Sequence, residues 1–207
     1  MKVIFGRRKQ GKSTLSLALA LDRSRIVIFD PNNQFPYIAS IPPQALAAWL
    51  EKETDAEWRI CRVGPIDTED IDEVFAMVAA ALFEADDVAF VVDEAHLLQS
   101  AKGINENLDR MIRRSTSTQS LILNTHRVTD AHNNTRYHAV QTFFFSSYLP
   151  RELKAVGDNF SPEVAAKLPA LPPHHVLVME VGEGGVPDVS VWDNPEEWFI
   201  DLRNKNQ

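Results

Sequence analysis

Eight residues near the start of the chain, Gly6 to Ser13, have the types and spacing of a loop that binds nucleotide phosphates. They fit the pattern G-x-x-x-x-G-K-[ST], preceded by an apolar run and followed by a helix-forming run. The glycines let the backbone turn tightly, so that its N–H groups and the following helix N-terminus point at phosphate oxygens. In such a loop Lys12 reaches the β- and γ-phosphates, and the Ser13 hydroxyl binds Mg²⁺. The nucleotide-binding residues that we predict are Gly6, Arg8, Lys9, Gln10, Gly11, Lys12, Ser13 and Thr14.

Two carboxylates follow another apolar run, Val88 to Val92. An Asp at the end of such a strand supports Mg²⁺ beside the Ser hydroxyl, which is the role that we predict for Asp93. The adjacent Glu94 would orient the attacking water and take its proton as general base. A strand-terminal Asp-Glu pair indicates ATP hydrolysis, since GTPases carry an N-K-x-D element that this sequence lacks. The structural alternative is an acidic pair at a helix N-terminus.

A third strand, Leu121 to Thr125, ends in polar residues and continues into His126. In ATP-driven motors an extra strand lies between the phosphate loop and the Asp-Glu strand, and a polar side chain on it senses the γ-phosphate. Asn124, Thr125 and His126 are the candidates for this sensor. His126 is equally compatible with a histidine of the core or the surface.

Arginines cluster on a helix predicted from Asn107 to Arg114. In a ring of subunits, such an arginine can cross the interface and neutralise charge in the neighbour's transition state. We favour Arg113 and Arg114 over Arg110 for this role, because we expect them nearest the carboxyl edge of the sheet. The alternative is a solvated helix C-terminus, where cations complement the helix dipole.

These residues sit in a chain whose apolar runs alternate with helical patterns, which predicts an α/β fold with a mostly parallel sheet and helices on both faces. The expected strands are Val3–Phe5, Arg25–Phe29, Trp58–Val63, Val88–Val92, Leu121–Thr125 and Thr142–Phe145, and the expected helices include Thr14–Leu21, Ala45–Leu50 and Ile71–Phe83. His174–Val181 and Val186–Trp192 flank Gly182–Gly185 and read as a β-hairpin, followed by a helix over Pro195–Leu202. We treat 1–207 as one domain, with residues 174–202 as its appendage.

Composition narrows the function classes. The 207 residues carry a net charge of −8, so no global basic field attracts nucleic acid or an anionic membrane. Cys61 is the only cysteine, which excludes an internal disulfide and fits a reducing compartment. The longest apolar stretch, Val74 to Phe83, is too short to span a bilayer, and we see no signal peptide. The chain reads as a soluble, cytoplasmic protein.

Four motifs in this order, GRRKQGKS, IVIFDPN, VVDEAH and LILNTHR, resemble the FtsK-HerA superfamily of DNA-pumping ATPases. Small size and an early phosphate loop look most like its genome-packaging members from tailless icosahedral viruses with an internal membrane. The resemblance covers about Met1 to Arg151. It implies phosphate binding by Gly11 to Thr14, metal support by Asp93, water activation by Glu94 and a sensor in LILNTHR, where relatives usually have Gln at the position of His126.

The resemblance further implies a homo-oligomeric ring, a hexamer or a pentamer, that hydrolyses ATP with Mg²⁺ to move double-stranded DNA into a preformed capsid. Capsid or membrane portal proteins are its expected docking partners. Basic candidates for sequence-independent DNA contacts are Lys102, Arg127, Arg136 and His138. One alternative is a P-loop kinase, although the Gly182–Gly185 turn lacks the arginine of a lid. Another is an assembly ATPase of the filamentous-phage type, which normally has a transmembrane anchor.

Overall fold

The computed structural model describes residues 1–52, 58–114, 118–181 and 187–192. Its core is one eight-stranded sheet with the strand order β10-β9-β8-β1-β7-β4-β2-β3. The strands are β1 (Lys2–Phe5), β2 (Arg25–Phe29), β3 (Arg59–Val63), β4 (Val88–Val92), β7 (Gln119–Thr125), β8 (Gln141–Phe145), β9 (Val176–Val181) and β10 (Pro187–Trp192). The six strands from β8 to β3 in this order are parallel, and β9 and β10 add an antiparallel hairpin beside β8.

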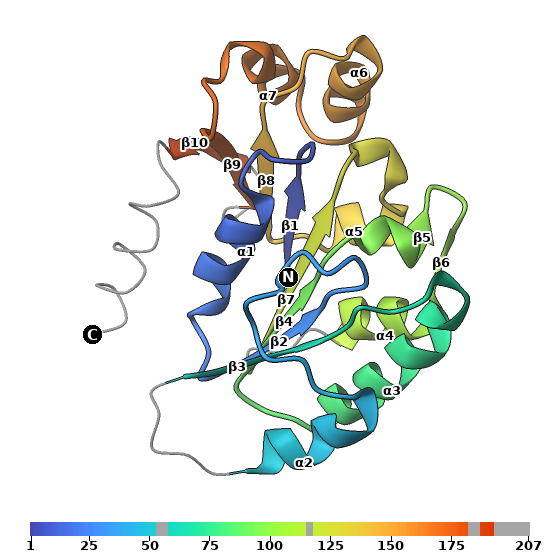
Figure 1. Ribbon diagram of the computed structural model, residues 1–207. Coiled ribbons are helices and arrows are strands. Elements are labelled where there is room, and N and C mark those ends of the chain that lie inside the picture. The colour runs from blue at the N-terminus through green and yellow to red at the C-terminus, as the bar shows by residue number, and fades with distance from the viewer. Residues whose placement is uncertain (53–57, 115–117, 182–186, 193–207) are drawn as a thin grey trace.

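Helices cover both faces of this sheet, as the sequence predicted (Figure 1). The helices are α1 (Lys12–Ala20), α2 (Leu46–Glu51), α3 (Ile71–Phe83), α4 (Glu106–Arg114), α5 (Asn133–Tyr137), α6 (Pro150–Asn159) and α7 (Pro162–Lys167). One apolar cluster joins α1 to alternate strand residues such as Ile4 and Ile122, and the other joins α3 and α4 to their neighbours such as Val3 and Leu123. The strands bury both faces, which is why they read as continuous apolar runs.

The predicted helix bounds agree best with the structure where the apolar periodicity of the sequence is long. The helix Ile71–Phe83 has the predicted ends, and the predicted Asn107–Arg114 begins one residue earlier in α4. The predicted helix Ala45–Leu50 is split into a 3₁₀ turn, Pro43–Ala45, and the helix α2. The turn Gly182–Gly185 and the predicted helix Pro195–Leu202 fall outside the described residues.

A small hairpin of β5 (Gln99–Ser100) and β6 (Gly103–Ile104) was not predicted, nor was the helix pair α6 and α7 in full. Both strands of the hairpin have only two residues, which is too short for an alternating pattern to show. Within the parts of the chain that the structure describes, we find no helix with the length and apolar character needed to cross a membrane.

Candidate functional site

The predicted site residues meet because their strands end at one edge of the sheet. β7 lies between β1 and β4, with Phe5 paired to Thr125 and Leu123 paired to Val92. The carboxyl ends of parallel strands share an edge, so the phosphate loop, the Asp-Glu pair and His126 emerge side by side. This order also confirms the extra strand that was expected between the phosphate loop and the Asp-Glu strand.

The phosphate loop depends on backbone conformations that its two glycines permit. Gly11 has a φ of 103°, a region that L side chains rarely adopt, immediately before helix α1 begins at Lys12. A Cβ on Gly6 would lie 2.8 Å from Cδ2 of Phe145, too close for the loop to pass β8. Lys9 also has a positive φ, 65°. The loop therefore turns tightly into the N-terminus of α1, where free N–H groups favour an anion.

Lys12 is buried at this turn, and its Nζ donates a hydrogen bond to the carbonyl oxygen of Arg7, 3.0 Å away. Burial lowers the pKa of the Lys12 ammonium, and the nearby carboxylates of Glu94 and Asp93 oppose this shift. A buried cation beside two carboxylates at the start of the helix is placed to attract phosphate oxygens.

The side chain of Gln10 connects the phosphate loop to the end of β8 by hydrogen bonds. Its amide Nε2 donates to the backbone oxygen of Ser146 at 2.9 Å, while its Oε1 accepts from the Arg7 N–H at 2.5 Å. These bonds fix the loop against the end of β8. Gln10 was predicted among the nucleotide-binding residues, and here its side chain is occupied by the protein itself.

Asp93 lies at the end of β4 and is buried, with 3% of its surface exposed. Its Oδ1 accepts a hydrogen bond from Asn124 Nδ2 at 3.0 Å, and the same amide donates to Ser16 Oγ on α1 at 3.1 Å. Among the described residues its other oxygen, Oδ2, has no hydrogen-bond partner. Burial raises the pKa of Asp93 to about 6, although the bond from Asn124 acts in the opposite direction. Asn124, predicted as a sensor, thus touches the carboxylate that it orients.

Glu94 follows in a left-handed conformation, with a φ of 53° and a ψ of 44°. Its buried carboxylate turns toward two histidines: Oε2 lies 2.5 Å from Nε2 of His126 and 3.2 Å from Nδ1 of His96. His96 was not predicted as a site residue, although the string Asp93-Glu94-Ala95-His96 was visible in the sequence. Burial lowers the pKa of the His96 imidazole, against the raising effect of Glu94.

Lys12, Asp93 and Glu94 line one open cavity of about 740 Å³. It is lined by Arg8, Lys9, Gly11, Lys12, Ser13, Thr14, Gln34, Asp93, Glu94 and His174. Six of the eight predicted nucleotide-binding residues are in this set. The other two, Gly6 and Gln10, belong to the loop but do not line this cavity, and Gly6 lines a smaller one. Gln34 arrives through the turn after β2, where Asp30 accepts its N–H at 2.7 Å. His174 comes from the segment before β9, far along the chain, and no sequence pattern predicted that it would line the cavity.

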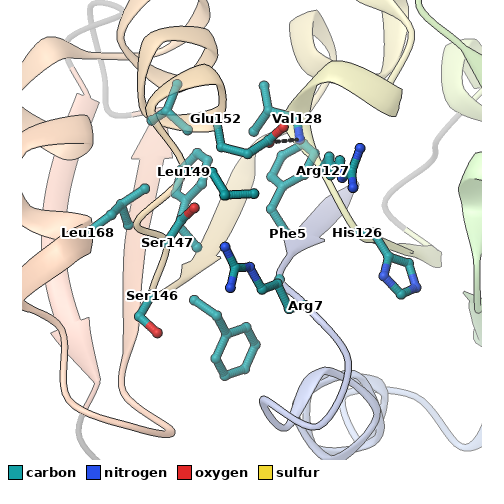
Figure 2. A pocket seen from close by; sticks show the side chains of 14 residues that line it. Phe5, Arg7, His126, Arg127, Val128, Ser146, Ser147, Leu149, Glu152 and Leu168 are labelled. Carbon is teal, nitrogen blue, oxygen red and sulfur yellow. Dashed lines mark hydrogen bonds between the residues drawn. The ribbon is translucent and has the colours of Figure 1, made fainter.

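A smaller cavity of about 260 Å³ opens on the other side of the phosphate loop. Figure 2 shows Arg7 pointing into it, below Leu149 and Glu152, with His126 at its rim. Glu152 Oε2 accepts the N–H of Val128 at 3.1 Å, which ties helix α6 to the segment after β7. His126 thus lines the smaller cavity and contacts Glu94, which lines the larger one.

The two arginines predicted to face a neighbouring active site lie at the opposite edge. Helix α4 leads into the amino end of β7, so the expectation that Arg113 and Arg114 sit nearest the carboxyl edge is wrong. Arg113 Nε pairs with Asp109 Oδ2 at 2.9 Å, and the Arg114 guanidinium lies 5.5 Å from the ring centre of Phe83. Both side chains thus contact residues of their own chain at the edge of the sheet opposite the phosphate loop.

The basic candidates for DNA contacts differ in solvent exposure and in the hydrogen bonds of their side chains. Lys102, Arg127 and His138 are exposed, and Lys102 lies at the tip of the β5–β6 hairpin. Arg136 donates to the carbonyl oxygen of Val128 at 3.2 Å and bonds Asn133. Arg136 therefore braces the segment that follows β7.

Solved structures of P-loop NTPases are similar to this chain. The genome packaging NTPase B204 from Sulfolobus turreted icosahedral virus 2, in complex with ATP-γS, gives a TM-score of 0.69 at 18% identity, over 91% of this chain and 95% of that chain. B204 from Sulfolobus turreted icosahedral virus, described as its DNA-packaging ATPase, gives 0.67 at 18% identity, with coverage of 91% and 95%. VirB4 of Thermoanaerobacter pseudethanolicus gives 0.57 at 13% identity, over 91% of this chain and 87% of that chain.

No protein-family model matches the sequence, and no curated protein matches it either. At such identities the structural likeness shows the fold. The chain therefore has the fold of P-loop NTPases, as the sequence predicted.

Proposed function

We propose that this protein hydrolyses ATP with Mg²⁺ and uses the reaction to move double-stranded DNA, as in packaging a viral genome into a preformed capsid. One observation carries the proposal: Lys12, Asp93 and Glu94 converge on a single cavity at the mouth of the phosphate loop. A cation for phosphates, a carboxylate for a metal and a second carboxylate for water are the parts that phosphoryl transfer to water requires.

Phosphate binding falls to the loop and the start of α1. Backbone N–H groups around Gly11 would hold the β-phosphate, and Lys12 would exchange its bond to the Arg7 carbonyl for the β- and γ-phosphate oxygens. The cavity has room for a nucleotide, since small-molecule pockets typically measure about 300–1,000 Å³. Arg8 and Lys9 on its wall add positive charge beside the triphosphate.

The residues present fit a magnesium ion. Magnesium prefers carboxylate and hydroxyl oxygens, and Ser13 and Asp93 line the same cavity. Asp93 Oδ2 is buried and, in the described part of the chain, makes no hydrogen bond, while Asn124 fixes the other oxygen. Ser13 and Asp93 would thus hold the ion, the carboxylate directly or through water. When bound, Mg²⁺ would neutralise negative charge that develops on the phosphate oxygens.

Water activation falls to Glu94. Its carboxylate lines the cavity next to Lys12 and would accept a proton from the water that attacks the γ-phosphorus. The bond between the γ-phosphorus and the bridging oxygen breaks, and ADP and inorganic phosphate leave. His126, in contact with Glu94, would report the state of the γ-phosphate from the end of β7.

Support for DNA as the moved polymer comes from the fold, which resembles that of NTPases described as packaging DNA. The exposed side chains of Lys102, Arg127 and His138 offer local positive charge on a chain whose net charge is −8. Contacts of this kind go to phosphates and do not distinguish sequences. A homo-oligomeric ring would bring several such sets of charges around one duplex, and a capsid or membrane portal protein would supply the docking site.

The test is ATP turnover, measured as released inorganic phosphate, with and without double-stranded DNA across a salt series. We expect DNA to stimulate turnover at low salt, the effect to fade as salt rises, and nucleotide to promote a ring in sedimentation. Turnover indifferent to DNA, from a chain that stays monomeric with nucleotide, would contradict the motor. Phosphate release that requires an added small-molecule acceptor would indicate a kinase.

A further inference from the structure

Three side chains at the carboxyl edge offer metal-ligand atoms to one point. Glu94, His96 and His126 each contribute one such atom, and all three atoms lie within 4.8 Å of one another. Glu94 and His96 come from the turn after β4, and His126 comes from the end of the neighbouring strand β7. Two imidazoles and one carboxylate form a donor set that suits divalent transition metals.

The three atoms face one another without a well-aligned hydrogen bond between them. Oε2 of Glu94, Nδ1 of His96 and Nε2 of His126 are buried, and none makes a hydrogen bond within the described residues, although Oε2 lies close enough to pair with either imidazole when that ring is protonated. Buried polar atoms are nearly always hydrogen-bonded, so three together indicate a missing partner. Glu94 also holds the left-handed conformation that turns its carboxylate toward the histidines, with a φ of 53°. Strained backbone of this kind tends to persist where a site needs it.

The spacing fits a small ion. Ligands of a tetrahedral zinc ion at bond lengths near 2.0–2.1 Å are separated by roughly 3.3 Å. The distance from His96 Nδ1 to Glu94 Oε2 is 3.2 Å. His126 Nε2 lies 2.5 Å from the same oxygen and would have to move outward by less than about 1 Å. The histidines are half-buried, with 31% and 21% of their side chains exposed, so solvent can deliver an ion and complete its shell.

We propose that Glu94, His96 and His126 form a binding site for a divalent transition metal ion of the zinc type. Imidazole nitrogens favour such ions over magnesium, which prefers oxygen ligands. Of these three residues only Glu94 lines the cavity of the phosphate loop, and the donor set differs from that of Ser13 and Asp93.

Occupancy of this site would control hydrolysis, a consequence that rests on the proposed function. A zinc ion bound to the Glu94 carboxylate withdraws the base that takes the proton from water. The phosphate loop is untouched, so nucleotide still binds. The zinc-bound protein would thus be an inhibited, nucleotide-loaded state.

The binding test uses the full, nucleotide-free chain, so it does not depend on ATP hydrolysis. We would titrate Zn²⁺ calorimetrically in excess Mg²⁺, and Co²⁺ by its visible absorption. We expect one ion per chain, a cobalt spectrum of four-coordinate type, and affinity at least about tenfold weaker in His96→Ala and Glu94→Gln. The exposed His138→Ala is the matched control, and its affinity should equal that of the unaltered chain. Circular dichroism establishes that each variant is folded.

Two results would overturn the site: no stoichiometric binding by the folded chain, or equal binding by His96→Ala and Glu94→Gln. Control of hydrolysis by zinc is measured separately, as inhibition of Mg²⁺-supported ATP turnover by Zn²⁺. A chelator should reverse this inhibition, and His96→Ala should weaken it. Zinc bound at these residues without inhibition would uphold the metal site and contradict the role of Glu94 in hydrolysis.

Discussion

The two ends of the parallel sheet differ in how their polar side chains are paired. At the amino end, Gln119 donates to the carbonyl oxygens of Leu82 and Ala85 at 2.8 and 2.5 Å, and Lys2 pairs with Asp22 at 2.9 Å, although a second oxygen of Asp22 makes no hydrogen bond among the described residues. The carboxyl end gathers more buried polar atoms that make no hydrogen bond within the described residues, and the Glu94 oxygen among them lies at ion-pair distance from both histidines. These atoms belong to Asp93, Glu94, His96, Asn124, Thr125 and His126.

We infer from this difference that the amino end of the sheet contributes to stability and that the carboxyl end serves ligand binding. A paired polar group adds modestly to stability, while a buried group without a partner costs free energy that the fold must supply elsewhere. The carboxyl edge holds such groups in place through rigid strands and a few bonds, such as Asn124 to Asp93. We infer that its missing partners are ligands: phosphates, a metal ion and water.

Among substitutions at the two edges of the sheet, removal of the Lys12 cation at the carboxyl edge should change ATP turnover most. Lys12→Ala should reduce ATP turnover by at least about 10²–10³-fold, because a preorganised charge at the developing phosphate charge is removed. Steady-state phosphate release measures the change. Lys154→Ala, an exposed lysine on α6 paired with Asp158, is the matched control and should keep full turnover. Equal turnover of both variants would break the comparison.

A second effect concerns stability at the same edge. The folded pKa of Asp93, about 6, exceeds its usual value of 3.8, so without cation the buried carboxylate destabilises the fold increasingly as pH rises through this window. Asp93→Asn keeps the shape and removes the charge. It should gain on the order of 1–3 kcal/mol in free energy of unfolding at pH 7 with chelator, and little below pH 4. Urea titration at both pH values checks this; a loss at pH 7 would contradict it.

The amino edge should respond in the opposite sense. Gln119→Leu removes the donor to two carbonyl oxygens near the end of α3 and should cost about 1–2 kcal/mol in free energy of unfolding. ATP turnover at 25 °C should stay the same. A stable variant that has lost turnover would show that this edge takes part in catalysis.

The smallest effect is expected from the arginines of α4. Arg113→Ala/Arg114→Ala should keep turnover within about twofold, since both side chains contact their own subunit at the amino edge and exposed pairs contribute little. A large loss that recovers on mixing with Lys12→Ala subunits would show instead that these arginines act across a subunit interface.

Local pattern predicted much of this molecule. The phosphate loop, the ends of α3 and the Asp93–Glu94 pair follow from adjacent residues, so the sequence was sufficient for them. The contact of His96 and His126 with one carboxylate depends on β4 and β7 being neighbours, and His174 reaches the cavity from the far end of the chain. Contacts between residues that are distant in the chain produce no periodic pattern in the sequence, so they could not be predicted from it.

The error over Arg113 and Arg114 has a different origin. A helix that leads into a parallel strand ends at the amino edge, since the strand must start there. The order of the predicted elements already contained this constraint. The position of Arg113 and Arg114 was therefore predictable, whereas the histidine pair around Glu94 required the structure.

Glu94→Gln is the most direct test of Glu94 as the general base, in a paired measurement of nucleotide affinity and single-turnover hydrolysis. The substitution keeps the size of the side chain and removes its capacity to accept a proton. A non-hydrolysable ATP analogue should bind within about threefold of normal, while hydrolysis should fall by about 10²–10⁴-fold. Hydrolysis that continues at the normal rate, with the analogue still bound, would contradict the assignment of Glu94 as the base.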